Sequence, residues 1–239
     1  GEFEPTYALK LDYTAFMKYG SLILSHKEGQ RLRLGSFAGW TVSDAVLMYG
    51  EGALYKQGDA RYPLEEILFE QGIPTGLVGE QDDSLEATIL LGGSYTFADG
   101  PTVSVEYVYN GGGYNDDQAE QFWSLAGKAS QGYSLIKDQV PDLTKYLQEN
   151  SGALGLGLMR KNYLMIQYHQ IQIQDRFNLI LRYTINLDDS SSQLIPIIEC
   201  YVGDHAQLFL IGNQNFGPHD SEFRAFVDRS VMAGGEYTF

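Results

Sequence analysis

Apolar and polar residues alternate along most of this chain. The pattern is clearest in segment 85–97, where one set of alternate positions is apolar: Leu85, Ala87, Ile89, Leu91, Gly93, Tyr95 and Phe97. The positions between them include Glu86, Thr88, Ser94 and Thr96. Successive side chains of a β-strand point to opposite faces, so this segment is predicted to be a strand with one apolar and one polar face.

Ten other segments show the same period of two. They cover residues 7–14, 17–27, 31–41, 45–57, 102–110, 154–173, 177–187, 193–202, 206–215 and 229–239. We predict eleven strands, or twelve if 154–173 is split at Arg160-Lys161-Asn162, and a bulge near Ile171, where the phase breaks. Most of these segments have 10 to 13 residues. A strand that crosses a membrane needs about 9–11 residues, whereas strands of globular proteins average about 5–6.

Short turns alternate with longer connections between these strands. The turns lie at 41–44, 98–101, 174–176 and 203–205, and the connections at 27–30, 58–84, 113–152, 188–192 and 216–228. The two long loops, 58–84 and 113–152, are predicted to hold short helices at 62–69, 116–126 and 141–148. The aromatic residues of the second loop, among them Phe122 and Trp123, either pack against the sheet after the loop folds inward or hold the loop together. The whole chain, 1–239, is treated as a single domain.

Composition narrows the function classes. The net charge of -15 argues against nucleic acid and against an anionic lipid surface, because both attract Lys and Arg. The lone Cys200 excludes an intramolecular disulfide. Tyr is frequent, with 17 residues against 12 Phe and 2 Trp, which suits a boundary between polar and apolar surroundings. We expect no cofactor, no metal site and no catalytic residue.

The last nine residues carry a recognisable pattern. One set of alternate positions is Val231, Ala233, Gly235, Tyr237 and Phe239, and the chain stops on that final aromatic residue. This strand resembles the closing strand of Gram-negative outer-membrane β-barrels. The resemblance implies an all-β fold, an antiparallel transmembrane β-barrel of about 11–12 strands, in contact with outer-membrane lipid. It also implies that Tyr237 and Phe239 act as a signal for the barrel-assembly machinery.

The resemblance also gives every strand a direction. If the final strand runs from the outside to the periplasm, all the long connections lie outside, as they do in such barrels. The count of eleven, however, starts the first strand outside, whereas single-chain bacterial barrels have even strand numbers. We therefore expect this chain to be the C-terminal portion of a larger barrel, completed by N-terminal strands or by a partner protein.

If the apolar faces meet lipid, the opposite faces line the interior. The predicted pore-lining residues are the charged residues and one histidine on those faces: Lys10, Arg31, Arg33, Glu51, Glu86, Glu106, His169, Arg182, Glu199 and Glu236. They predict a channel for passive diffusion of ions or small polar solutes, although the same charges could pair with each other or with an inserted loop. A barrel that acts as scaffold or sheath for a partner protein is the second hypothesis, and a soluble β-sandwich binding module is the third. No segment resembles the catalytic motifs of outer-membrane phospholipases or proteases, so we do not expect an enzyme.

Overall fold

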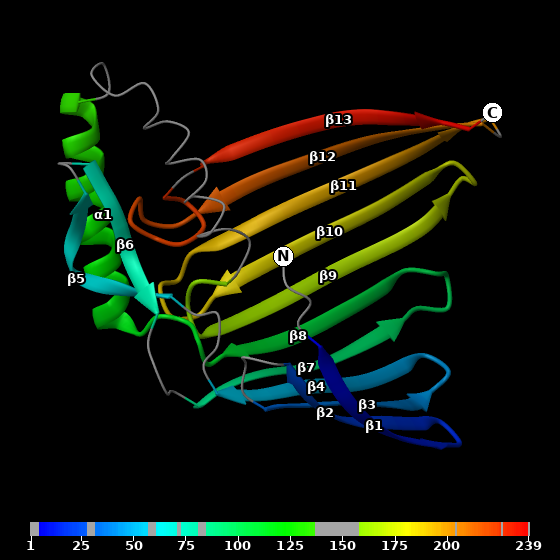
Figure 1. Cartoon of the computed structure of the whole chain (residues 1–239). Coiled ribbons are helices and arrows are strands. Elements are labelled where there is room, and N and C mark those ends of the chain that lie inside the picture. Colours follow the sequence, from blue (N-terminus) through cyan, green and yellow to red (C-terminus); the bar gives the residue numbers. More distant parts are fainter. Residues whose placement is uncertain are drawn as a thin grey trace.

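The chain folds around one large antiparallel sheet (Figure 1). The computed structural model describes residues 5–27, 32–56, 61–70, 73–80, 85–136, 158–203, 205–225 and 227–238. Eleven strands form the sheet in the order β1-β2-β3-β4-β7-β8-β9-β10-β11-β12-β13. Their bounds are β1 Thr6–Ala15, β2 Lys18–Lys27, β3 Arg33–Ser43, β4 Val46–Lys56, β7 Leu85–Thr96, β8 Thr102–Asn110, β9 Asn162–Ile173, β10 Phe177–Asn186, β11 Ser192–Val202, β12 Ala206–Phe216 and β13 Arg229–Tyr237. The all-β, antiparallel fold class is confirmed. β9 begins at Asn162, so 158–161, which were predicted to belong to a strand over 154–173, do not belong to it, and 154–157 lie outside the described residues.

The register joins the apolar positions of neighbouring strands into one continuous face. One row across the sheet runs through Leu9, Leu24, Leu34, Leu54 and Ala87, each paired with the next. These apolar side chains are also the more exposed ones, which is the reverse of a soluble protein. For example, in β3 and β7 the apolar positions are mostly exposed, and the positions between them are mostly half-buried or buried. The polar face is therefore the crowded, inner side of the sheet.

Crowding on the polar face is visible where aromatic rings lie over glycines of the adjacent strand. Tyr19 covers Gly39, Tyr49 covers Gly92, and the Phe209 ring covers Gly234. The Tyr49 hydroxyl also donates a hydrogen bond to the carboxylate of Glu106, which holds its ring in place. These contacts fill the space that a missing side chain would otherwise leave between strands.

Replacing Gly92 by alanine tests this packing. A Cβ atom at Gly92 would lie 2.6 Å from Cε2 of Tyr49, so the ring must move and its bond to Glu106 must stretch. We expect Gly92→Ala to lower the free energy of unfolding by about 1–3 kcal/mol, the usual cost of overpacking, measured by urea titration in detergent micelles. Gly35→Ala is the matched control on the same face, because the nearest atom there is 3.9 Å from the added Cβ and should permit it. Equal stability of the two variants would contradict the packing role of Tyr49.

Short turns gather at one end of the sheet and long connections at the other (Figure 1). The turn end holds the connections β1–β2, β3–β4, β7–β8, β9–β10 and β11–β12, together with the end of β13. The predicted bulge is confirmed, since the pairing of β9 with β10 shifts between Phe177 and Leu179 and Gln172 has a φ of 56°. The turns expected from the sequence thus lie at one end, and the long connections β4–β7, β8–β9 and β12–β13 lie at the other, whereas β2–β3 and β10–β11 are joined there by connections as short as the turn β7–β8.

Within the residues that the structure describes, each of the two outermost strands has one unpaired edge. Within the described part of the chain, β1 pairs only with β2 and β13 only with β12. Because the number of strands is odd, β1 and β13 run in the same direction, from the loop end to the turn end. The sheet is therefore open, and an antiparallel closure would need an odd number of additional strands.

The first long loop corrects one prediction. Residues 62–69 were expected to form a helix, but the chain forms the hairpin β5 (Arg61–Glu70) and β6 (Ile73–Glu80). The local pattern of apolar residues fits a helix, yet Pro63 lacks an amide proton and the neighbouring strand supplies backbone partners. Tertiary pairing overrides local propensity here. Arg61 pairs with Glu80 and Tyr62 with Gly79 across the hairpin.

The second long loop contains the predicted helix, longer than expected. Helix α1 spans Asp116–Ile136, whereas the prediction was 116–126, and the helix predicted at 141–148 lies outside the described residues. Its start is capped reciprocally, because the amide of Gln118 donates to Asn115 Oδ1 at 2.9 Å and the amide of Asn115 donates to Gln118 Oε1 at 3.0 Å. No helix in the described ranges has the length and apolar character needed to span a membrane.

Candidate functional site

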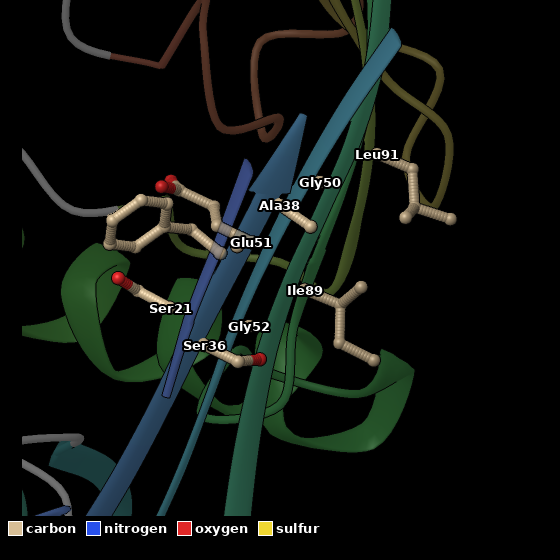
Figure 2. Close-up of a pocket in the computed structure, with 10 residues that line it drawn as sticks. Ser21, Ser36, Ala38, Gly50, Glu51, Gly52, Ile89 and Leu91 are labelled. Carbon is tan, nitrogen blue, oxygen red and sulfur yellow. The ribbon is translucent and has the colours of Figure 1, made fainter. Parts of the chain in front are cut away.

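The polar face of the sheet carries the residues singled out from the sequence. Register places nine of them there: Lys10, Arg33, Glu51, Glu86, Glu106, His169, Arg182, Glu199 and Glu236. Arg31 lies outside the described residues. Figure 2 shows the two faces at the middle of β2 to β7, with Ser21 and Glu51 directed to one side and Ile89 and Leu91 to the other. Alternation in the sequence was therefore sufficient to sort these residues by face.

The structure brings several of these charges to partners that the sequence analysis did not single out. The Lys10 ammonium lies 3.0 Å from Asp12 Oδ1 and 5.6 Å from the centre of the Phe37 ring. The Arg33 guanidinium lies 5.8 Å from the centre of the Tyr55 ring. Alternation puts Asp12, Phe37 and Tyr55 on the same face, so their presence could have been predicted, but their contacts depend on register.

The remaining charges bind mainly neutral groups. Arg182 donates from Nε to Gln167 at 2.8 Å, and the carboxylate of Glu199 accepts a hydrogen bond from Asn178 Nδ2 at 2.9 Å. In the described part of the chain, Glu51 and Glu236 make no hydrogen bond or ion pair. The polar face thus offers two unpaired carboxylates to whatever occupies the space in front of it.

The small residues of β2, β3 and β4 leave a shallow open hollow in the sheet. It is lined by Gly20, Ser36, Ala38, Gly50 and Gly52, with Ile89 and Leu91 of β7 beside them (Figure 2). Most of its lining residues have no polar side-chain group. Glu51 is the one titratable residue among those that line it.

Beyond the loop ends of the strands lies a second structural unit, which we call the cap. It consists of α1, β5, β6 and the connections 111–115, 158–161, 187–191 and 217–225 (Figure 1). Its apolar centre is formed by Tyr114, Ala119 and Phe122, with Tyr62, Trp123 and Met159 packed around them. Phe122 and Trp123 therefore hold the loops together, which was one of the two alternatives. Among described helices and strands, α1 contacts β5 and β6 only, so it does not fold inward onto the wall.

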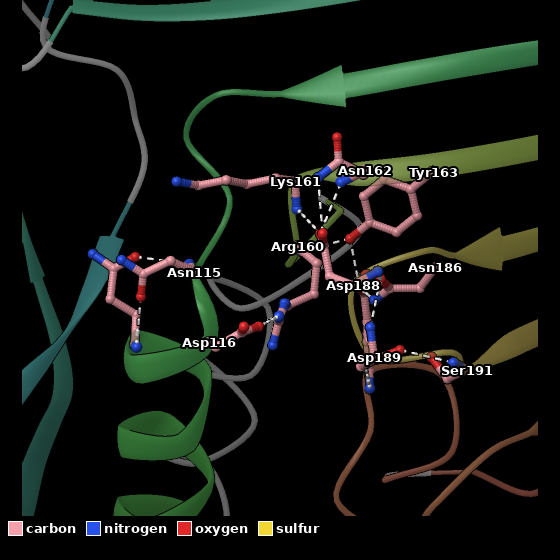
Figure 3. Close-up of polar contacts among 12 residues, drawn as sticks. Asn115, Asp116, Arg160, Lys161, Asn162, Tyr163, Asn186, Asp188, Asp189 and Ser191 are labelled. Atoms are coloured by element: carbon pink, nitrogen blue, oxygen red, sulfur yellow. Dashed lines mark hydrogen bonds and ion pairs between the residues drawn. The ribbon is translucent and has the colours of Figure 1, made fainter.

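Polar groups tie the cap to the first residues of β9 (Figure 3). Asp188 Oδ2 accepts the amides of Lys161 and Asn162 at 2.8 and 2.9 Å, and Oδ1 accepts Asn162 Nδ2 at 2.8 Å. Arg160 forms an ion pair with Asp116 at the start of α1. Asp188 and Asp116 thus serve as acceptors for backbone and side-chain donors.

Glu222 lies at the centre of a second set of contacts. Its carboxylate accepts hydrogen bonds from the amide of Met159 at 2.9 Å, from Asn186 Nδ2 at 2.8 Å and from the hydroxyl of Tyr163. Its own amide donates to Asp189 Oδ2 at 2.9 Å. Sequence reasoning did not single out Glu222, because it lies in a polar loop with no periodic pattern.

The contacts of Glu222 in the cap are expected to weaken as pH rises above 4.5. Burial, reinforced by the nearby Asp189 carboxylate, raises the pKa of Glu222 above its ordinary value of 4.5. A raised acid pKa contributes stability that is present below pH 4.5 and is lost as pH rises through the folded-state pKa. Burial also opposes ionisation of Asp188, but the hydrogen bonds from Asn162 and Lys161 outweigh it and lower that pKa, so Asp188 stays ionised across this window. Hydrogen exchange of the 222–225 amides, corrected for intrinsic rates, should show faster opening as pH rises.

Glu222→Gln is the test of this assignment, because glutamine does not titrate. The variant should lose the pH dependence of opening between pH 4.5 and neutrality, whatever its absolute stability. If the opening of residues 222–225 depends on pH in Glu222→Gln as it does in the wild type, another group causes the pH dependence.

The fold defines an all-β protein whose antiparallel sheet has an exposed apolar face and a charged opposite face. No family model matches the chain, and no curated protein matches it. Among solved structures, the chain is similar to OmpT (in-vitro folded), an outer membrane protein of Vibrio cholerae, with a TM-score of 0.49 and 10% sequence identity. The similarity covers 96% of this chain and 63% of that protein, so the chain spans less than two thirds of its length.

Proposed function

We propose that the eleven-stranded sheet is part of the wall of an outer-membrane β-barrel, and that its polar face lines a passage for ions or small polar solutes. The observation that carries this proposal is the exposure of the apolar face. Leu9 and Leu11 are each 61% exposed, Leu91 is 58% and Leu208 is 53%. Burying such a side chain is worth about 1.5–3 kcal/mol, so a face of this extent favours a lipid environment over water.

The soluble β-sandwich is the weakest of the three hypotheses. A sandwich needs a second sheet packed on the apolar face of the first. Among the described residues, the second sheet is only the hairpin β5–β6, which lies in the cap against α1. The buried apolar residues are few and gather near the loop end, at Val108, Tyr114, Ala119, Phe122, Leu125 and Tyr163.

The unpaired edges of β1 and β13 indicate how the barrel could close. We propose that an odd number of further strands pairs with β1 and β13, since every pair in the main sheet is antiparallel. The same free edges favour the second candidate function, a sheath in which a partner protein supplies those strands. In both cases the cap and the long connections face the outside and the end of β13 faces the periplasm.

The charges of the polar face favour cations. Among the described residues Glu51 and Glu236 have no partner, whereas Lys10 is neutralised by Asp12 and Arg33 lies against the Tyr55 ring. The net charge of the chain, -15, acts in the same direction. The proposal includes no catalytic step.

Conductance tests the channel, and detergent dependence tests the membrane location. The protein extracted from outer membranes should require detergent to stay in solution and should produce cation-preferring current steps in a planar bilayer. If the assembled protein carries no current, the channel hypothesis is rejected and the sheath hypothesis takes its place. A protein that stays soluble without detergent would overturn the barrel itself.

A further inference from the structure

The polar face is not polar throughout. On β10 to β13 one row across the sheet consists of aliphatic side chains, Ile180, Ile197, Ile211 and Met232, each paired with the next. Ile195 lies beside this row on the same face of β11. We call these five residues the aliphatic belt. A face that lines water would ordinarily carry charged or polar groups at such positions.

No described helix or strand packs on the belt. The strands β10 to β13 contact only their neighbours in the sheet, and α1 and the hairpin β5–β6 contact each other. The four isoleucines are half-buried by the strands beside them, and Met232 is 55% exposed. The belt therefore presents apolar surface toward the space in front of the inner face.

Carboxylates flank the belt on the side of the turn end. Glu199 is two residues beyond Ile197 on β11, which places it roughly 7 Å away along the strand. Glu236 is four residues beyond Met232 on β13, roughly 13 Å away. Glu236 is exposed and has no partner among described residues, and Glu199 is bound on one side by Asn178. On the opposite side of the belt lie Arg182, whose Nε is held by Gln167, and, just before β13, Asp228, which is paired with Arg224. His169 pairs directly with Ile180 at the β9 end of the row.

We propose that the aliphatic belt with Glu199 and Glu236 forms a binding site for cationic amphiphiles, small solutes with an alkyl or aryl body and an ammonium end. The apolar body lies on the belt, and the ammonium faces Glu199, with the charge of Glu236 farther along the polar face. A cation is selected over an anion because two carboxylates lie beyond the belt and the chain carries a net charge of -15. This inference rests on the proposed channel and adds the class of solute that the inner wall retains.

The test uses n-hexylammonium as the probe, with tetramethylammonium as a cation that lacks an apolar body. In single-channel recordings in KCl, hexylammonium should interrupt the current at concentrations where tetramethylammonium does not. Ile197→Ala should raise the half-blocking concentration roughly fivefold, because apolar contact with the alkyl chain is lost. Glu236→Gln should raise it as well, since it removes the unpaired charge.

The matched control is the next residue along β11. Ile198 is 41% exposed on the opposite, apolar face, so Ile198→Ala should leave the block unchanged. Equal block of the wild type and Ile197→Ala would overturn the site, and so would block by n-hexanesulfonate as strong as that by hexylammonium. Calorimetric titration of hexylammonium into the detergent-solubilised protein gives a readout without current. Binding that Ile197→Ala weakens and Ile198→Ala does not would support the site even if no current appears, and absence of such a difference would reject it.

Discussion

Leu91→Arg is expected to block stable insertion of this protein into a membrane. Leu91 lies at the middle of β7 on the apolar face and is 58% exposed. An arginine on the lipid face of a barrel costs about 2–4 kcal/mol at the bilayer midplane, a large share of the stability of one domain. We expect the variant to lower the free energy of unfolding in lipid vesicles by that amount, measured by urea titration. Its yield in the outer-membrane fraction should fall severalfold.

Leu90→Arg is the matched control, one residue away. Leu90 is on the polar face and pairs directly with Glu51 of β4, so an arginine there would face water and an acidic partner. This variant should insert and unfold almost as the wild type does. If both substitutions have the same effect, the assignment of the two faces is wrong. If neither has an effect, the sheet does not lie in lipid.

Glu51→Lys is expected to reduce the cation preference of the channel. Glu51 lies at the middle of β4, is exposed on the polar face, and has no partner among described residues. The substitution changes the local charge by two units where permeating ions would pass. We expect the permeability ratio of K⁺ to Cl⁻ to fall roughly two- to fivefold, read from the reversal potential in a KCl gradient.

Glu120→Lys separates a local from a global effect of charge. Glu120 is exposed on α1 in the cap, and this substitution changes the net charge of the chain by the same amount. It should move the reversal potential far less than Glu51→Lys does, because it lies outside the sheet and salt screens it. Equal shifts in the two variants would place the selectivity in the overall charge rather than in the polar face.

The strands were predictable because the alternation of apolar and polar residues that marks a strand involves only neighbouring positions in the sequence. A residue such as Glu106 lies on the polar face since its neighbours on β8, Val105 and Tyr107, must point the other way. The same rule placed the bulge near Ile171, where the phase of the pattern breaks. The helix α1 was also recognisable from its acidic start, although its end was not.

The hairpin β5–β6 and the cap were not predictable in the same way. Residues 62–69 carry a helical pattern, and only the presence of a neighbouring strand decides their conformation. Glu222 became important because the fold brings Tyr163 and Asn186 to it, from positions 59 and 36 residues away in sequence. Such contacts have no periodic signature, since they depend on how loops meet rather than on the repeat of one strand.

The sequence alone determined where most strands lie, which residues share a face and where the short turns fall. Each of these follows from the two-residue repeat of an extended backbone and from the residue types that end it. Only the tertiary structure decided that β1 and β13 leave free edges, that the cap lies beyond the strands, and that the isoleucines of β10 to β12 line up with Met232. These features depend on which strands pair and in which register, and that pairing joins residues far apart in the chain.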